Sequence, residues 1–136
     1  MTLIVLFLWA FAAATILPLS SEVPLAVEVA RTGHWHVPVA VATVGNVLGA
    51  ATTYGLARLA VTRAPEPSPR VARAAALLAR YGSPVLLLSW VPLIGDVLVA
   101  LAGAARMPLA PFLLWTTIGK AARYVAVAYV SWQLEI

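Results

Sequence analysis

The sequence contains no cysteine and few charged residues. Asp, Glu, Lys and Arg make up 10% of its 136 residues, whereas soluble domains carry about a quarter. Without cysteine the chain has no disulfide, no thiolate metal ligand and no cysteine nucleophile. Hydrophobic residues reach 62% and the mean hydropathy is +0.94, more than a small water-soluble core can bury. The composition excludes a soluble enzyme, a disordered tail and a coiled coil, and it predicts an integral membrane protein.

Two uncharged runs organise the first half of the chain. No Lys or Arg precedes residues 2–17. A secretory leader would carry a positive charge there, so we expect this run to remain in the mature protein. The run ends at Pro18, and a short apolar return follows over residues 23–30. Because a spanning helix needs about 20 apolar residues, these pieces predict a re-entrant helical hairpin. Residues 37–57 are uncharged throughout and long enough to cross.

The second half contains a similar pair of segments. Residues 84–102 are long enough to cross, but Pro92, Gly95 and Asp96 interrupt them in the middle. Irregular backbone at membrane depth is tolerated where it is buried in protein or lines a wet cavity. We therefore predict a second re-entrant hairpin here. Residues 107–132 then form the second crossing helix.

The segment between the two halves is rich in arginine. Residues 58–80 hold five Arg and one Glu, and residues 64–69 form a helix-breaking linker. The remainder predicts a basic amphipathic helix lying on the membrane. The positive-inside rule makes this segment cytoplasmic.

An internal repeat relates the halves. Shifting the chain by 74 residues places Pro18 over Pro92, Glu22 over Asp96, and residues 43–46 over 117–120. We predict one all-α membrane domain, residues 1–136, with repeat 1 over 1–60, the linker and amphipathic helix over 61–81, and repeat 2 over 82–132.

One hairpin plus one crossing helix gives an odd number of crossings, so the repeats are predicted to be inverted, as in many transporters. The chain would then be a multi-pass protein of the plasma or bacterial inner membrane with both termini outside. Four simple spans are the alternative, and they would put both termini inside.

Charges at membrane depth mark the candidate site. Lys120 and Arg123 lie on one face of the last crossing helix, where each ionised residue costs about 2.5–3.5 kcal/mol. Glu22 and Asp96, at the two hairpin breaks, are the obvious counter-charges. The functional interpretation is a hydrated site for an anionic headgroup, with the carboxylates gating it or carrying protons. The alternative is that the carboxylates cap the returning half-helices and the cations neutralise them.

Other motifs carry less chemistry. Gly45 and Gly49 form a G-x-x-x-G motif, a common sign of close helix packing that leaves a homo-oligomer open. Asn46 is a polar group in a crossing helix, predicted to bond between helices or to substrate. No nucleophile–base pair, phosphate loop or metal cluster stands out, so we expect no enzyme activity, no cofactor and no metal. Nothing indicates nucleic-acid binding.

These residues resemble the DedA superfamily (SNARE-associated or VTT domain), and most closely its short YqaA-like branch. Ser21-Glu22-Val23 looks like the first re-entrant signature of that family. The first crossing helix matches the family spacing G-x3-G-x4-Y-x3-R at Gly45, Gly49, Tyr54 and Arg58. The second half matches a proline, then Ala-Gly, then Arg-Met, at Pro92, Ala102, Gly103, Arg106 and Met107.

The resemblance implies opposed re-entrant hairpins and lipid translocation, often tied to the proton gradient. Longer members have arginines around the second proline, where this chain has Ser89 and Gly95, and an acidic residue at the position of Ala50. We expect Lys120 and Arg123 to replace the lost cations. The candidate substrate-binding set is therefore Lys120, Arg123, Asn46 and Arg58.

Two functions follow from these observations. The first is a transporter or flippase of an anionic lipid, either an undecaprenyl-phosphate-like carrier or a phospholipid. The second is a non-transporting membrane scaffold or assembly factor for the cell envelope.

Overall fold

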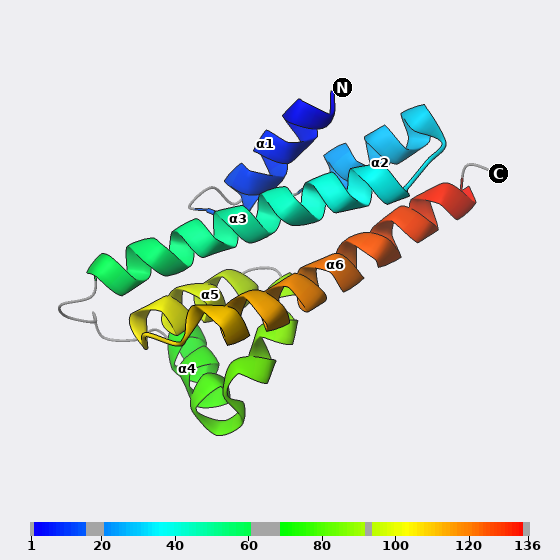
Figure 1. Ribbon diagram of the computed structural model, residues 1–136. Coiled ribbons are helices and arrows are strands. Elements are labelled where there is room, and N and C mark those ends of the chain that lie inside the picture. The colour runs from blue at the N-terminus through cyan, green and yellow to red at the C-terminus, as the bar shows by residue number, and fades with distance from the viewer. Residues whose placement is uncertain (1, 16–20, 61–68, 92–93, 135–136) are drawn as a thin grey trace. The chain divides into compact units, whose positions relative to one another are not determined.

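The computed structural model describes residues 2–15, 21–60, 69–91 and 94–134, and these residues form helices and no strand. In chain order the elements are α1 (Leu3–Ala13), α2 (Glu22–Thr32), α3 (His36–Ala60), α4 (Pro69–Tyr81), the 3-10 helix η1 (Ser83–Trp90), α5 (Ile94–Ala104) and α6 (Leu109–Leu134) (Figure 1). The predicted all-helical class is confirmed. Pro18 and Pro92, the predicted hairpin breaks, lie outside the described residues.

The helices fall into two length classes. α1, α2 and α5 have 11 residues each and η1 has 8. At 1.5 Å per residue, 11 residues extend about 16 Å, roughly half of a bilayer's hydrocarbon core. α3 and α6 have 25 and 26 residues, or about 37–39 Å. The order short, short, long therefore occurs once before α4 and once after it.

One described helix is both long and apolar enough to cross a membrane. It is α3, over His36–Leu59, with a mean hydropathy of 1.3 in its most apolar window. α6 is one residue longer than α3, but it is not apolar enough to qualify as a spanning helix by the same measure. It carries Lys120 and Arg123. The crossing of α6 stays a prediction.

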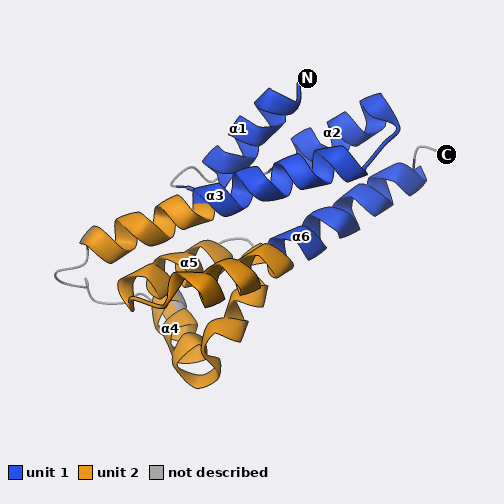
Figure 2. Cartoon of the chain, in the orientation of Figure 1, with its two compact units in different colours: residues 1–49, 120–136 blue, residues 50–119 orange. Residues whose placement is uncertain are grey.

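The chain forms two compact units, coloured separately in Figure 2. Unit 1 contains residues 1–49 and 120–136, and unit 2 contains residues 50–119. The boundaries fall inside the long helices, so each unit holds one end of α3 and one end of α6. The units are thus built differently from the predicted repeats, which divide the chain between α3 and η1.

Unit 1 combines α1 and α2 with the first part of α3 and the last part of α6. Its hydrophobic core draws on all four helices and contains Leu6, Ala10, Leu25, Val29, Val39, Ala42, Tyr124 and Ala128. α1 and α3 approach closely, because a Cβ on Gly45 would lie 2.6 Å from the carbonyl oxygen of Phe7, and one on Gly49 would meet the carbonyl of Phe11. The G-x-x-x-G motif therefore packs two helices of the same chain together.

Unit 2 combines α4, η1 and α5 with the last part of α3 and the first part of α6. Its buried side chains come from every element and include Tyr54, Ala74, Val85, Leu86, Leu98, Val99, Ala102 and Phe112. A Cβ on Gly119 would lie 2.7 Å from the carbonyl oxygen of Leu87 in η1. Gly119 is the position that the 74-residue shift pairs with Gly45, and each glycine lies against the first short helix of its own half.

The amphipathic helix predicted after the linker is present as α4, with Arg73 and Arg80 exposed and Ala74 buried. Its location on the membrane surface stays a prediction. α2 ends at Gly33, and Gly82 follows α4; both glycines have a left-handed φ, near 70°. α5 ends differently, because Arg106 takes the left-handed conformation, at φ 59°.

Candidate functional site

The start of α2 is tied to α6 by two adjacent pairs of side chains in unit 1. The Ser21 hydroxyl and the Tyr124 hydroxyl share a hydrogen bond, and Tyr124 is fully buried. The residue after Ser21 and the residue before Tyr124 form an ion pair. In it, Arg123 Nε donates to Glu22 Oε1 over 2.7 Å and the Nη2 group contacts the same oxygen. Ser21 makes no capping bond through its side chain, so its hydroxyl serves the contact between helices.

Lys120 lies one turn before Arg123 on α6 and is 3% exposed. The spacings of three and four residues place Lys120 on the same side of the helix as Arg123 and Tyr124. Glu22 keeps 41% of its side chain exposed, against 18% for Arg123. Glu22, Lys120 and Arg123 together carry one negative and two positive charges. These three residues are called the α2–α6 site below.

The other predicted site residues lie elsewhere. Asn46, in unit 1, donates from Nδ2 to the Ala10 carbonyl over 2.9 Å. Asp96 is exposed in the first turn of α5, and both Asp96 and Arg58 belong to unit 2. Gly95 lies against the Ser89 backbone, where a Cβ would collide with the carbonyl. The structure therefore pairs Glu22 with a predicted cation and places Asp96 in the other unit.

Buried hydroxyl and amide oxygens occur in both units. Within the described residues, four such atoms have no hydrogen-bond partner: Thr43 Oγ1, Asn46 Oδ1, Ser89 Oγ and Thr116 Oγ1. Thr15 and Thr32 instead donate to carbonyls of their own helical turns, over 2.8 and 2.9 Å. Leaving a buried polar group unpaired costs about 1–3 kcal/mol. An ordered water molecule that reaches such an atom would satisfy it.

A second set of contacts joins α3 to the end of α5 in unit 2. The Tyr54 hydroxyl donates to the Met107 carbonyl and accepts from Arg58 Nη1 over 2.8 Å. The Tyr54 ring stacks on Phe112 with 4.4 Å between centroids, and Gly103 lies against the Tyr54 backbone. The motifs quoted from α3 and from the end of α5 are therefore in contact with each other, which gives these residues a structural role.

Sequence reasoning missed several of these residues. The sequence assigns no role to Tyr124 or Phe112, because nothing local indicates a partner so far away in the chain. Glu28 is fully buried and accepts from Arg31 Nη2 over 2.6 Å and from Nε over 3.2 Å. This carboxylate raises the pKa of the exposed Arg31 guanidinium above its usual value. No group of three or more His, Cys, Asp or Glu that could hold a metal occurs in the described part of the chain.

Comparison with known proteins assigns the chain to a family. The VTT domain family matches residues 17–133, and the chain belongs to this family. Among individual proteins, the chain is 42% identical over 134 residues to the inner membrane protein YqaA of Escherichia coli (strain K12), covering 98% of this chain and 93% of that protein. The same values hold for YqaA of Shigella flexneri. An uncharacterized protein of Haemophilus influenzae is 40% identical, covering 93% and 85% of the two chains. No solved structure matches the chain.

Proposed function

We propose that this chain is a multi-pass protein of the bacterial inner membrane that moves an anionic lipid across the bilayer and is not an enzyme. The lipid is an undecaprenyl-phosphate-like carrier or a phospholipid. Membership of the VTT domain family, relatives named as inner membrane proteins and the low charge of the chain support this location. Large apolar side chains exposed on the long helices, such as Val44, Leu114 and Ile118, agree with contact to lipid.

The proposed architecture is a pair of inverted repeats, each with a re-entrant hairpin and a crossing helix. Two features support it: the element order short, short, long occurs twice, and Gly45 and Gly119 pack against equivalent helices. Helices of about 16 Å are too short to cross the hydrocarbon core by themselves. Discontinuous helices of this kind bring helix ends and polar groups to the middle of the membrane in known transporters.

The observation that carries the proposed function is the ion pair between Glu22 and Arg123 beside Lys120. The two cations of the α2–α6 site, Arg123 and Lys120, are proposed to attract a lipid phosphate. A phosphate competes with Glu22 for the Arg123 guanidinium, since both are oxygen acceptors for the same donors. Arg123 is the group that binds phosphate in this proposal, and Lys120 adds a second positive charge.

Proton coupling follows from the same competition. A protonated Glu22 no longer balances Arg123, which leaves the guanidinium to the lipid phosphate. Loss of that proton restores the ion pair and expels the phosphate. Glu22 is half-exposed, so a proton can reach it from a hydrated site. Asp96 is proposed to serve similarly in unit 2, where it occupies the matching position after the second break.

Transport by purified protein in liposomes tests the proposal. The liposomes contain a labelled polyprenyl phosphate or a labelled phosphatidylglycerol, and the fraction that changes leaflet is measured with time. Arg123→Gln is expected to slow transport by roughly tenfold or more, because a hydrogen bond to a charged group contributes about 1.5–3 kcal/mol. Glu22→Gln should reduce the response of the rate to a pH gradient.

The matched control is Arg73→Gln, which removes the same charge from an exposed position on α4. Insertion should be retained in Arg123→Gln, since removing a charge from α6 lowers the cost of placing that helix in lipid. Wild-type rates in both Lys120→Gln and Arg123→Gln would remove the assigned site. No transport of either lipid by the wild-type protein would remove the function.

The topology is tested separately with reporter fusions. Inverted repeats with two re-entrant hairpins place both termini outside and the segment of residues 58–80 in the cytoplasm. Alkaline phosphatase should therefore be active at both ends, and a fluorescent protein that folds only in the cytoplasm should be dark there. The opposite pattern at both ends would support four simple spans.

A scaffold without transport is the second candidate. It is favoured by the contacts of Tyr54, Arg58 and Met107, which use family-motif residues to hold helices together. This candidate predicts normal complementation of a deletion strain after Glu22, Asp96, Lys120 and Arg123 are all neutralised. The transporter predicts loss of complementation by the same variant when it is present in the membrane at wild-type level.

A further inference from the structure

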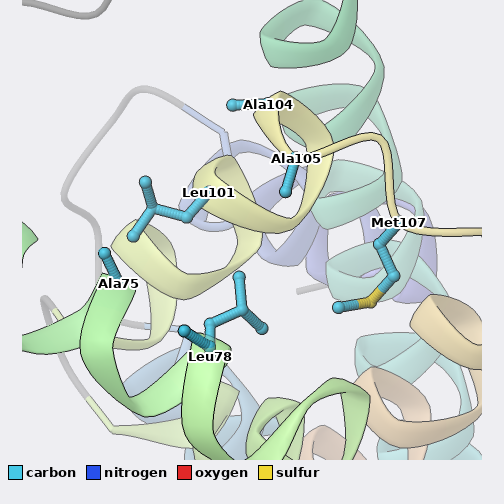
Figure 3. Close-up of a pocket in the computed structure, with 7 residues that line it drawn as sticks. Ala75, Leu78, Leu101, Ala104, Ala105 and Met107 are labelled. Atoms are coloured by element: carbon cyan, nitrogen blue, oxygen red, sulfur yellow. The ribbon is translucent and has the colours of Figure 1, made fainter.

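An apolar groove of about 550 Å³ lies in unit 2 between α4, the end of α5 and the residues that follow α5. Figure 3 shows side chains from both helices around this space, with Met107 pointing toward Leu78 of α4. The labelled lining residues are all alanine, leucine or methionine: Ala75, Leu78, Leu101, Ala104, Ala105 and Met107. No lining side chain can form a strong hydrogen bond, so the groove suits a hydrocarbon chain.

Two arginines stand beside the Met107 end of the groove. Arg106 is the neighbour of two lining residues, and its side chain is exposed. Arg58 is also exposed, and its Nη1 lies 3.5 Å from the Met107 carbonyl oxygen. An arginine has five N–H donors in a planar fork that matches phosphate oxygens. The apolar groove therefore ends next to two groups suited to a phosphate.

The backbone of Arg106 gives an independent reason to assign it a function. Met107 N donates to the Ala102 carbonyl and Arg106 N to the Gly103 carbonyl, both over 3.0 Å, which closes α5 in a Schellman motif. Glycine is the usual residue at the left-handed position of this motif, and Gly33 takes the left-handed conformation after α2. An arginine held in this conformation is strained, and strain of this kind collects at functional sites.

The charge distribution identifies the headgroup. Residues 50–119 contain six arginines and two carboxylates. The +4 net charge of the chain therefore lies entirely in unit 2, and the remaining residues are neutral overall. The partner that complements an apolar groove beside this positive charge is an anionic phospholipid.

We propose that the groove between α4 and α5 binds one acyl chain of an anionic phospholipid, and that Arg58 and Arg106 hold its phosphate. This bound lipid fixes α4 against α5 at the membrane surface. The site involves none of the residues of the α2–α6 site. It therefore stands whether or not the chain transports lipid.

The experiment measures lipid retention by the full-length protein in detergent, using native mass spectrometry. The protein is titrated with dioleoyl phosphatidylglycerol and, separately, with dioleoyl phosphatidylcholine. We expect the first phosphatidylglycerol to bind roughly tenfold more tightly than phosphatidylcholine, as one charge-assisted contact would give. Equal binding of the two lipids would overturn the proposal.

Arg106→Gly is the decisive variant, because glycine suits the left-handed backbone and removes only the side chain. It should bind phosphatidylglycerol several-fold more weakly while it melts at the wild-type temperature or above. The control is Arg73→Gln, whose side chain lies about 200° around α4 from Ala75. Unchanged binding in Arg106→Gly, or an equal loss in Arg73→Gln, would contradict the proposal, since the second result indicates attraction to the whole surface.

Ala104→Leu tests the acyl-chain part of the proposal. The larger side chain fills the groove and should reduce retention of both lipids, whereas Ala72→Leu, on an exposed part of α4 outside the lining, should not. Retention at the wild-type level in Ala104→Leu would exclude the groove as the binding site. Arg123→Gln should retain phosphatidylglycerol normally even where transport is lost, so the two proposals fail separately.

Discussion

The two units join their helices with different chemistry. In unit 1 the second short helix meets α6 through side chains, with a hydroxyl pair at Ser21 and Tyr124 and an ion pair at Glu22 and Arg123. In unit 2 the corresponding helix meets α3 through the backbone, with Gly103 against Tyr54 and the Tyr54 hydroxyl on a carbonyl. Unit 1 is neutral overall and unit 2 carries the net charge.

The two kinds of contact differ in whether protons and anions can break them. An ion pair between a half-exposed carboxylate and a guanidinium responds to protons and to competing anions. A glycine packed on a carbonyl responds to neither, because its energy comes from close packing. We therefore expect substitutions at the backbone contacts of unit 2, such as Gly103 on Tyr54, to act mainly on stability, and substitutions at the α2–α6 site to act mainly on transport.

The largest expected effect comes from Gly103→Ala. The new methyl group would collide with the Tyr54 carbonyl oxygen and lie 2.9 Å from its carbon, and a backbone group cannot give way as a flexible side chain does. Overpacking of this kind lowers the free energy of unfolding by about 1–3 kcal/mol, and we expect the upper end of that range. Unfolding in mixed micelles, followed by circular dichroism, measures the change.

Gly55→Ala is the matched control in the same unit. A Cβ at Gly55 meets nothing within 4 Å, and alanine is favoured over glycine within a helix by about 0.5–1 kcal/mol. This variant should be as stable as the wild type or slightly more so. Equal destabilisation by the two substitutions would remove the argument that close backbone contact holds unit 2 together.

Tyr54→Phe and Tyr124→Phe are expected to have smaller effects on stability, and together they compare the two units. Each removes one hydroxyl and one hydrogen-bonded contact between helices, so each should lower the free energy of unfolding by about 1 kcal/mol. The transport rate and its pH profile should change only in Tyr124→Phe, since Tyr124 holds the helix end that carries Glu22. A transport defect of equal size in Tyr54→Phe would show that the units do not divide stability and function.

Much of the element pattern could be predicted from hydropathy. The uncharged run of residues 37–57 lies within α3, the arginine-rich helix is present as α4, and Gly95 and Asp96 lie in the first turn of α5. These features depend on local composition, which determines whether a segment can cross, turn back or lie at an interface. The 3-10 geometry of η1 could not be predicted, because proline, serine and leucine are compatible with several kinds of helix.

Most contacts across the chain could not be predicted. Ser21 and Tyr124 are 103 residues apart and Tyr54 and Met107 are 53 apart, and neither pair has a local pattern that names its partner. The carboxylates were expected near one shared pocket, whereas Glu22 and Asp96 belong to different units. The pairing of Glu22 with Arg123 follows the expectation that charges at membrane depth find partners.

The exchange of helix ends between the units has a consequence for how such a chain can arise. A cut in the segment between α3 and α4 would leave neither fragment with all the residues of either unit, since each unit takes residues from both sides of the cut. On the predicted repeat, an ancestor of half this length would complete these units only by exchanging the end of its long helix with a second copy.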